Sequence, residues 1–190
     1  RSASGSASQV TTTRRPGHVV LMGAPYPGGA RCGAAPFGLS CRAVEALRGV
    51  QFIVGELSLV LPAEHVLEVA ARVRWTPLPS APEGVLGAFV HRGVVAVAVD
   101  VATRLGFAPA PPRLDDHLLV VQTARRRLGL LVPRALGYVE LAGPAVVSPP
   151  VVAPALRGVV PWEGSVLLVQ DVEALLSLEE HRRLDAVAPP

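Results

Sequence analysis

The sequence is poor in aromatic residues: only 4% of its 190 residues are Phe, Trp or Tyr, and it holds two cysteines and one methionine. With so few large rings, the core has to be filled by valine, leucine and alanine, which are abundant because half of the residues are hydrophobic. No apolar run reaches the roughly 18–20 residues that a membrane-spanning helix needs, so the sequence indicates a soluble protein. A chain of this length usually forms one domain, or one domain with a tail.

The sequence also lacks the residue patterns of common catalytic chemistries. Its five histidines are far apart, and it has neither a His-Glu-x-x-His segment nor a phosphate-binding glycine loop. Cys32 and Cys41 have no metal-ligand spacing; unpaired thiols in a reducing cytoplasm are favoured, and a disulfide between them stays open. We therefore expect no catalytic residue, no metal site and no cofactor.

A modest net charge of +3 gives little reason to expect nucleic-acid binding. The clearest basic cluster, Arg125-Arg126-Arg127, lies between two apolar runs where a hairpin turn is expected. No aromatic side chains accompany it on which bases could stack. A solvated turn is therefore favoured over a nucleic-acid patch.

The first 48 residues differ in composition from the rest of the chain. A Ser/Thr-rich start is followed by a segment of Gly, Pro and Ala, and neither has the apolar content to build a core. We expect residues 1–48 to be a disordered, low-complexity segment, with one short helix around Val44 and Leu47. The folded domain is then expected to span residues 49–187.

Beyond this segment, short apolar runs alternate with turn residues. Gln51–Val54 and Leu57–Leu61 flank the tight turn Gly55-Glu56. Further strands are expected at 118–123, 127–132, 139–141, 159–161 and 166–169, and helices at Glu83–Leu86 and within Val172–Leu184. Many short strands at a spacing of roughly 8–12 residues indicate a barrel or sandwich rather than a parallel α/β sheet.

The most informative stretch is Gly87–Gly106, GAFVHRGVVAVAVDVATRLG. Val94–Val99 contains only Val and Ala, which predicts a strand buried on both faces. The turn Arg92-Gly93 places a cation at the tip of a hairpin. Asp100 ends the strand and is expected to accept hydrogen bonds from the backbone of the following turn.

These twenty residues resemble the CheW-like domain of bacterial chemosensory systems. The family pattern reads roughly G-x-x-x-L-R-G-x-x-x-P-V-x-D-L-R-x-x-x-G, and its positions match Gly87, Arg92, Gly93, Asp100 and Gly106 without a gap. The likeness continues upstream and downstream in family order, from about Val50 to about Val187, and includes the family's V-x-E-[IV] element.

Several positions depart from the family pattern. His91 replaces the leucine before Arg-Gly, Val97 replaces the strand proline, and Val101-Ala102 replaces the Leu-Arg pair. In the second half, Pro133 stands where an aspartate is usual. Core positions stay apolar while surface positions differ, so the resemblance supports the fold more firmly than the identity of the partners.

The resemblance implies an all-β fold of two intertwined SH3-like five-stranded barrels with a C-terminal helix. It also implies a non-enzymatic, cytoplasmic adaptor that couples the cytoplasmic tip of a chemoreceptor to the regulatory domain of a CheA-like histidine kinase. Such a protein binds no nucleic acid and inserts in no membrane; recruitment to membrane receptor arrays stays open. The partner-binding residues that the family match carries over are Val66, Glu68, Val69, Arg92 and Gly93.

The residues themselves leave alternatives open. Arg92 is either a partner-facing cation or a pin for its own loop, and Glu68 is either a polar partner contact or a solvated strand residue. The rival function is a small β-barrel module that binds a ligand or nucleic acid, which would need surface aromatics or a basic stripe. A second rival is an enzyme whose site the sequence does not reveal.

Overall fold

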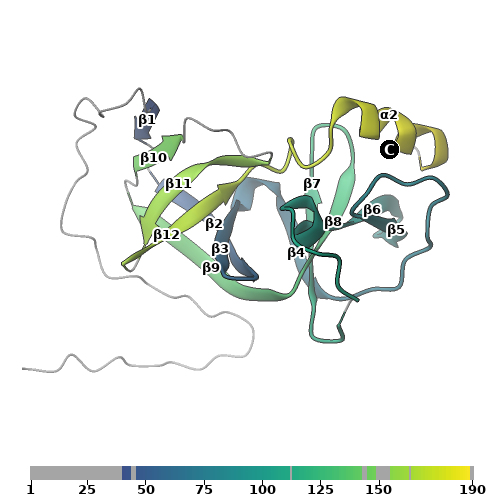
Figure 1. Cartoon of the computed structure of the whole chain (residues 1–190), viewed down its shortest axis with the longest axis horizontal. Coiled ribbons are helices and arrows are strands. Elements are labelled where there is room, and N and C mark those ends of the chain that lie inside the picture. Colours follow the sequence, from purple (N-terminus) through teal and green to yellow (C-terminus); the bar gives the residue numbers. More distant parts are fainter. Residues whose placement is uncertain are drawn as a thin grey trace, which may run out of the picture.

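The computed structural model describes residues 40–43, 46–111, 113–142, 145–148, 155–162 and 164–188. Within these ranges, strands dominate and form two sheets that lie side by side, accompanied by two α-helices and one short 3-10 turn (Figure 1). The expectation of an all-β fold with few helices is confirmed.

The larger sheet combines strands from both ends of the described chain. In sheet order these are β1 (Ser40–Ala43), β10 (Ala145–Ser148), β11 (Leu156–Trp162), β12 (Ser165–Gln170), β3 (Leu57–Pro62), β2 (Ala46–Val54) and β9 (Arg134–Ala142). All neighbours are antiparallel except β12 and β3. The expected hairpin around Gly55-Glu56 is confirmed, because Val54 pairs with Leu57.

This sheet has to curl strongly. β9 and β10 are five strand positions apart, which would separate them by about 24 Å in a flat sheet. Yet only residues 143 and 144 connect them, so Ala142 and Ala145 are at most about 11 Å apart. The two ends of the sheet must therefore approach each other.

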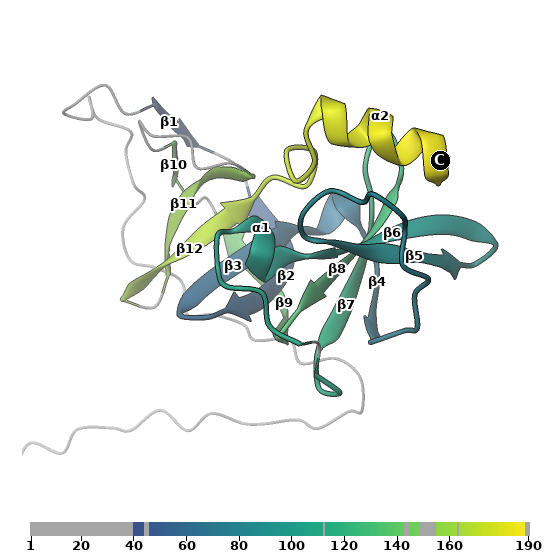
Figure 2. The same cartoon turned by 45° about the vertical axis from the view of Figure 1, so that its right-hand side comes forward.

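The smaller sheet is built from the middle of the chain. Its order is β4 (Val66–Ala71), β7 (His117–Gln122), β8 (Arg127–Val132), β6 (Val94–Asp100) and β5 (Val85–His91), with β6 and β8 parallel. A 3-10 turn at Ala63–His65 connects β3 to β4. In two views this sheet forms the lobe opposite β10–β12 (Figures 1 and 2), and Figure 2 shows the β5–β6 hairpin extending from it.

The two edges of the smaller sheet also meet. Thr76, five residues after β4, exchanges backbone hydrogen bonds of 2.7 and 2.8 Å with Ala88 of β5. The approach is close at Gly87, where an added Cβ would lie 2.3 Å from the carbonyl oxygen of Thr76. A glycine is therefore required at this position for the edges to meet.

Apolar side chains fill three cores. The largest lies between the sheets and contains, among others, Phe52, Leu59, Val97, Val99, Leu119, Leu128, Leu130 and Leu184. A second packs within the larger sheet around Val60, Val139, Val160 and Leu167. A third packs within the smaller sheet around Phe89, Ala96, Ala98 and Leu118. Strand β6 contributes to two of these cores, which confirms burial on both faces for Ala96–Val99, whereas Val94 and Val95 are exposed.

The helices differ in part from those expected. α1 (Val101–Arg104) is capped by Asp100, whose carboxylate accepts from the Ala102 N–H and the Thr103 hydroxyl, as predicted. Glu83–Leu86 is not helical, because Gly84 adopts a left-handed φ of +78° and Val85 already pairs with Val99.

The C-terminal helix is shorter than the sequence suggested. α2 (Leu178–Val187) starts at a capping box in which Ser177 and Glu180 satisfy each other's backbone N–H groups. Val172–Leu176 lies outside it as an irregular segment, and its Val172, Leu175 and Leu176 side chains are buried in the core between the sheets. The pattern of apolar residues there is due to burial rather than to helical periodicity.

The structure corrects part of what was expected for residues 1–48. Residues 1–39 and Val44 lie outside the described residues. Leu47 belongs to a strand rather than a helix, because Ala46–Gly49 pairs with Val139–Ala142 of β9. The boundary drawn at residue 48 therefore falls inside β2.

Two arginines hold α2 against the smaller sheet. Arg104 of α1 binds Glu180, and Arg126, in the turn between β7 and β8, donates to Asp185 and to the carbonyl of Ala188. Figure 2 shows α2 lying across this lobe, above β7 and β8. The prediction of a fully solvated arginine triplet is thus wrong at Arg126, whose side chain is 2% exposed.

Candidate partner-binding surface

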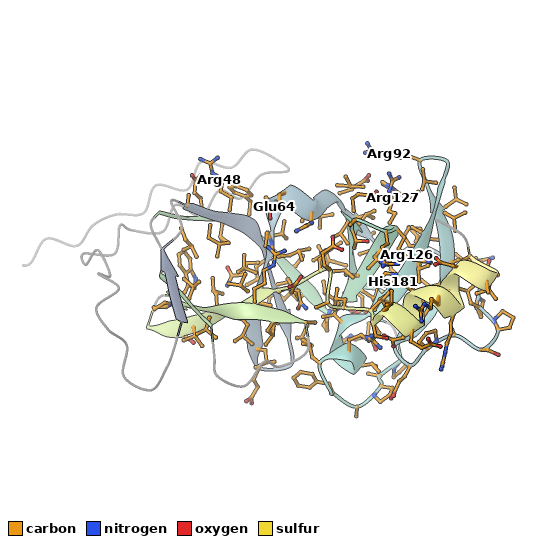
Figure 3. The ribbon with its side chains drawn as sticks, turned by 90° about the horizontal axis from the view of Figure 1, so that it is seen from above. Arg48, Glu64, Arg92, Arg126, Arg127 and His181 are labelled. Carbon is orange, nitrogen blue, oxygen red and sulfur yellow. The ribbon has the colours of Figure 1, made fainter. Side chains whose placement is uncertain are left out.

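The β5–β6 hairpin closes through the predicted two-residue turn. Arg92 and Gly93 both have left-handed backbone conformations, with φ of +51° and +78°, as a tight hairpin turn requires. For an arginine this conformation costs about 1–2 kcal/mol relative to the ordinary regions. The Arg92 side chain is 72% exposed at this tip, and Figure 3 shows it at the edge of the molecule with Arg127 beneath it.

Glu68 of β4 reaches this turn from the opposite edge of the smaller sheet. Its Oε2 accepts hydrogen bonds from Arg92 Nη2 at 2.8 Å and from His91 Nε2 at 3.0 Å. The hydrogen bonds from His91 and Arg92 lower the pKa of the Glu68 carboxyl below its ordinary value. Two residues predicted from distant motifs, Glu68 and Arg92, are therefore in direct contact.

His91 continues this polar cluster inward. Its Nδ1 lies 3.2 Å from Arg127 Nη1, which also donates to the His91 carbonyl at 3.1 Å. Arg127 Nε in turn contacts Gln122 Oε1 at 3.4 Å. Sequence reasoning missed the contribution of Arg127, because an arginine triplet in an expected turn carries no signal of which side chains turn inward.

Val66 and Val69 occupy different environments on β4. Val66 is half-buried and packs against the core between the sheets, whereas Val69 is exposed. A register shift between Val66 and Glu68 interrupts the regular pairing of β4 with β7. Gly93 lies in the turn beside Arg92, with open space around its Cα.

Exposed aliphatic side chains surround the ion-pair cluster. They come from β4 and from the hairpin: Leu67, Val69, Val90, Val94 and Val95. Val90 is the most open of these, at 70% exposure, and pairs across the hairpin with Val95. Charged groups with apolar neighbours are typical of a protein–protein interface rather than of a catalytic cleft.

The basic stripe that nucleic-acid binding would need is interrupted. Arg126 points into the protein toward α2, and Arg127 is half-buried against His91. In the part of the chain that the structure describes, no three His, Cys, Asp or Glu side chains come together to hold a metal ion. Nor does any helix there have the length and apolar character to cross a bilayer.

Comparison with known proteins identifies the family. The model of the CheW-like domain matches residues 48–180. This chain belongs to the CheW-like domain family. The resemblance that centred on Gly87–Gly106 is thereby confirmed, and with it the role of a chemotaxis coupling adaptor.

Curated relatives cover most of this CheW-like domain. A chemotaxis protein CheW of Rhizobium meliloti (strain 1021) is 29% identical over 136 residues, which are 69% of this chain and 88% of the relative. The protein FrzA of Myxococcus xanthus is 34% identical over 118 residues, or 60% of this chain and 74% of FrzA. The name of the first relative describes chemotaxis, and neither name states an enzymatic activity.

A solved structure has the same fold. The crystal structure of scaffolding protein TtCheW from Thermoanaerobacter tengcongensis superposes with a TM-score of 0.64 at 20% identity, covering 70% of this chain and 94% of TtCheW. The architecture is therefore that of CheW-like domains.

Proposed function

We propose that this chain is a non-enzymatic, cytoplasmic scaffold without a bound cofactor, which joins the cytoplasmic tip of a chemoreceptor to the regulatory domain of a CheA-like histidine kinase. The family match over residues 48–180 supports this role, as does the likeness to a protein named for scaffolding. Recruitment to receptor arrays at the membrane would then depend on these protein contacts.

The proposal includes the arrangement of the two sheets as SH3-like barrels. The connection of β9 to β10 across the larger sheet and the Thr76–Ala88 bridge across the smaller one both support near-closure. A core within each sheet, at Val60 and Phe89 for example, is what barrel interiors require. The core between the two sheets takes side chains from strands of both, such as Phe52 and Leu119.

Partner binding is assigned to the hairpin tip and to β4. Glu68, Val69, Arg92 and Gly93 form the contact surface, and Val66 supports β4 from beneath by packing on the core. The observation that carries this assignment is the exposed Arg92 side chain, held in a left-handed turn where glycine or asparagine would be less strained. A residue kept at such a cost is a candidate for function.

The chemistry of the contact follows from the guanidinium. A guanidinium has five N–H donors in a planar fork, and the contact with Glu68 Oε2 uses one of them. The others can meet a carboxylate or carbonyl of the partner, while Val69 and Val90 supply apolar area beside it. The contact with Glu68 therefore leaves most of the fork available to a partner.

An exchange of charges separates partner binding from a purely structural role. Arg92→Glu should weaken binding to the regulatory domain of a kinase encoded in the same genome by about 30-fold or more, the effect of losing a contact of roughly 2 kcal/mol. The double variant Glu68→Arg/Arg92→Glu restores an ion pair within the protein but leaves a carboxylate at the tip. It should still bind weakly.

The matched control is Arg48→Glu. Arg48 is also an exposed strand arginine paired with a glutamate, Glu140, at 2.9 Å, but it lies on the larger sheet away from the hairpin. Its reversal should leave binding unchanged. Recovery of binding in the charge-exchanged double variant would mean that Arg92 only pins its own loop, and an unaffected Arg92→Glu would place the partner surface elsewhere.

A further inference from the structure

The cluster at the hairpin holds a histidine whose two ring nitrogens meet opposite charges. His91 Nε2 faces Glu68 of β4, and His91 Nδ1 faces Arg127 of β8. The side chain is 12% exposed, so these contacts are made largely away from solvent. The family pattern has a leucine at this position, and the polar connection is therefore a feature of this chain.

The partners fix the form of the imidazole. A carboxylate only accepts and a guanidinium only donates, so Nε2 must carry the proton given to Glu68 and Nδ1 must accept from Arg127. This is the neutral ring in its Nε2–H tautomer. In this form His91 links Glu68 to Arg127 without a conflict of donors.

Protonation of the ring removes that link. The Nδ1 position then carries a hydrogen that faces the Arg127 guanidinium at 3.2 Å, which places two donors and two positive charges against each other. On the other side, the charged ring binds Glu68 more strongly, and Glu68 Oε2 is the same oxygen that holds Arg92. Arg127 is displaced, and Arg92 is held less tightly.

We propose that His91 makes the Glu68–Arg92 pair sensitive to pH, so that acidification releases Arg92 from Glu68 and adds positive charge to the hairpin tip. Its consequence for partner binding rests on the function proposed above. The charged groups that face His91 are Glu68 from β4, Arg127 from β8 and Arg92 from its own turn. With one carboxylate among them, protonation takes the cluster from a net charge of about +1 to about +2.

Arg127 has other acceptors to which it can turn. It contacts the His91 carbonyl at 3.1 Å and Gln122 Oε1 at 3.4 Å, so loss of the ring contact need not expel it from the sheet. The Gln122 carbonyl in turn lies 3.4 Å from His65 Nδ1, which places a second histidine one step farther from the cluster. The rearrangement is therefore local and leaves the strands in place.

Nuclear magnetic resonance of the free, full-length chain tests the proposal without a partner. Above the His91 transition the ring should show the Nε2–H tautomer, and the side-chain N–H signals of Arg92 and Arg127 should move with the same midpoint as the ring. An Nδ1–H tautomer at high pH, or arginine signals that do not follow the ring, would overturn the proposal.

Two substitutions at position 91 separate titration from hydrogen bonding. His91→Gln keeps a donor and an acceptor but does not titrate, and His91→Leu restores the family residue. Both should abolish the shared transition of Arg92 and Arg127, whereas the control His117→Gln, at the start of β7 in the same sheet, should retain it. A transition that survives in His91→Gln would assign it to another group and refute the inference.

Binding of the kinase regulatory domain tests whether the pH-sensitive pair affects the proposed function. Between one pH above and one pH below the midpoint found by resonance, the affinity of the parent should rise about two- to fivefold relative to His91→Gln at the same pH, the size expected for an exposed charge contact. Because parent and variant are compared at equal pH, titration of the kinase domain itself does not contribute to the difference in affinity. If neither protein binds while the resonance result holds, the proposed partner is wrong and the pH-sensitive pair stands; equal affinities of parent and variant at both pH values would overturn the release of Arg92 as a binding signal.

Discussion

Arg104 of α1 and Glu180 of α2 form a forked ion pair, with Nη1 2.6 Å from Oε1 and Nη2 2.7 Å from Oε2. The same guanidinium donates through Nε to the carbonyl of Leu175 at 2.9 Å and through Nη1 to that of Glu83 at 3.1 Å. One side chain therefore connects the turn before β5, the segment before α2 and α2 itself. Because both partners are largely buried, the contact is expected to matter for stability.

Arg104→Lys tests this connection while keeping the charge. An ammonium has no planar fork, so it loses the paired contact with Glu180 together with the carbonyl contacts. The free energy of unfolding should fall by about 1.5–3 kcal/mol, measured by urea denaturation. The control Arg183→Lys, whose exposed partner Glu179 is one turn away on α2, should change stability by less than about 0.5 kcal/mol. Equal losses of stability in the two variants would show that the forked geometry of Arg104 adds nothing beyond its charge.

The same pair gives the domain a defined acid sensitivity. Hydrogen bonds from Arg104, and from Ser177, lower the pKa of Glu180 from its ordinary 4.5 to about 2. The unfolded chain takes up a proton near pH 4.5 while the folded protein does not, so the stabilisation is complete above pH 4.5 and is lost as the pH falls toward 2. Urea denaturation at several pH values in this window should show a decline that is smaller in Glu180→Gln. A parallel decline in both proteins would assign the acid sensitivity to other carboxylates.

Features that depend on neighbouring residues were predictable from the sequence. The Arg92-Gly93 turn, the Val/Ala strand that follows it and the Asp100 cap all rest on local propensities, and the structure contains each of them. The same holds for β7 and β8, where continuous apolar runs mark strands buried on both faces.

Features that depend on long-range contacts were not predictable in this way. Nothing near Arg126 or Arg127 in the sequence distinguishes a solvated arginine from one paired with Asp185 or placed against His91, since those partners are 59 and 36 residues away. A short helix is expected at Glu83–Leu86 from the sequence, but Val85 has a strand partner in Val99, and tertiary pairing prevailed over the local expectation. The contact of Glu68 with Arg92 likewise needs the sheet edges to meet.

Gly87→Ala tests whether the two edges of the smaller sheet can meet only because position 87 has no side chain. A Cβ there would lie 2.3 Å from the Thr76 carbonyl oxygen, so the Thr76–Ala88 bridge should open. We expect a loss of about 1–3 kcal/mol and faster amide exchange at Thr76 and Ala88. Gly106→Ala is the matched control: its φ is also positive, at +85°, but an added Cβ would meet nothing within 4 Å. Exchange at the bridge should be unchanged in this control, and accelerated exchange in both variants would attribute the effect to backbone strain alone.

The N-terminal boundary of the domain can be located by truncation. The composition of residues 1–39 predicts that their removal leaves stability unchanged. Removal of residues 1–48 should instead be costly, because it deletes β1 and the part of β2 that pairs with Glu140–Ala142. It also removes Leu47, which is buried in the core of the larger sheet.

A chain starting at Ser40 and one starting at Gly49 should therefore differ by at least about 2 kcal/mol in the free energy of unfolding, the lower end of the cost of deleting a buried leucine. Leu47→Ala in the full chain measures the side-chain part of this difference, and whatever exceeds it belongs to the lost pairing of β1 with β10 and of Ala46–Arg48 with β9. Thermal and urea unfolding of the three proteins, compared with the parent, give these terms separately. If the chain starting at Gly49 unfolds like the parent, the pairing at the start of β2 adds nothing to stability, and the domain is complete from residue 49.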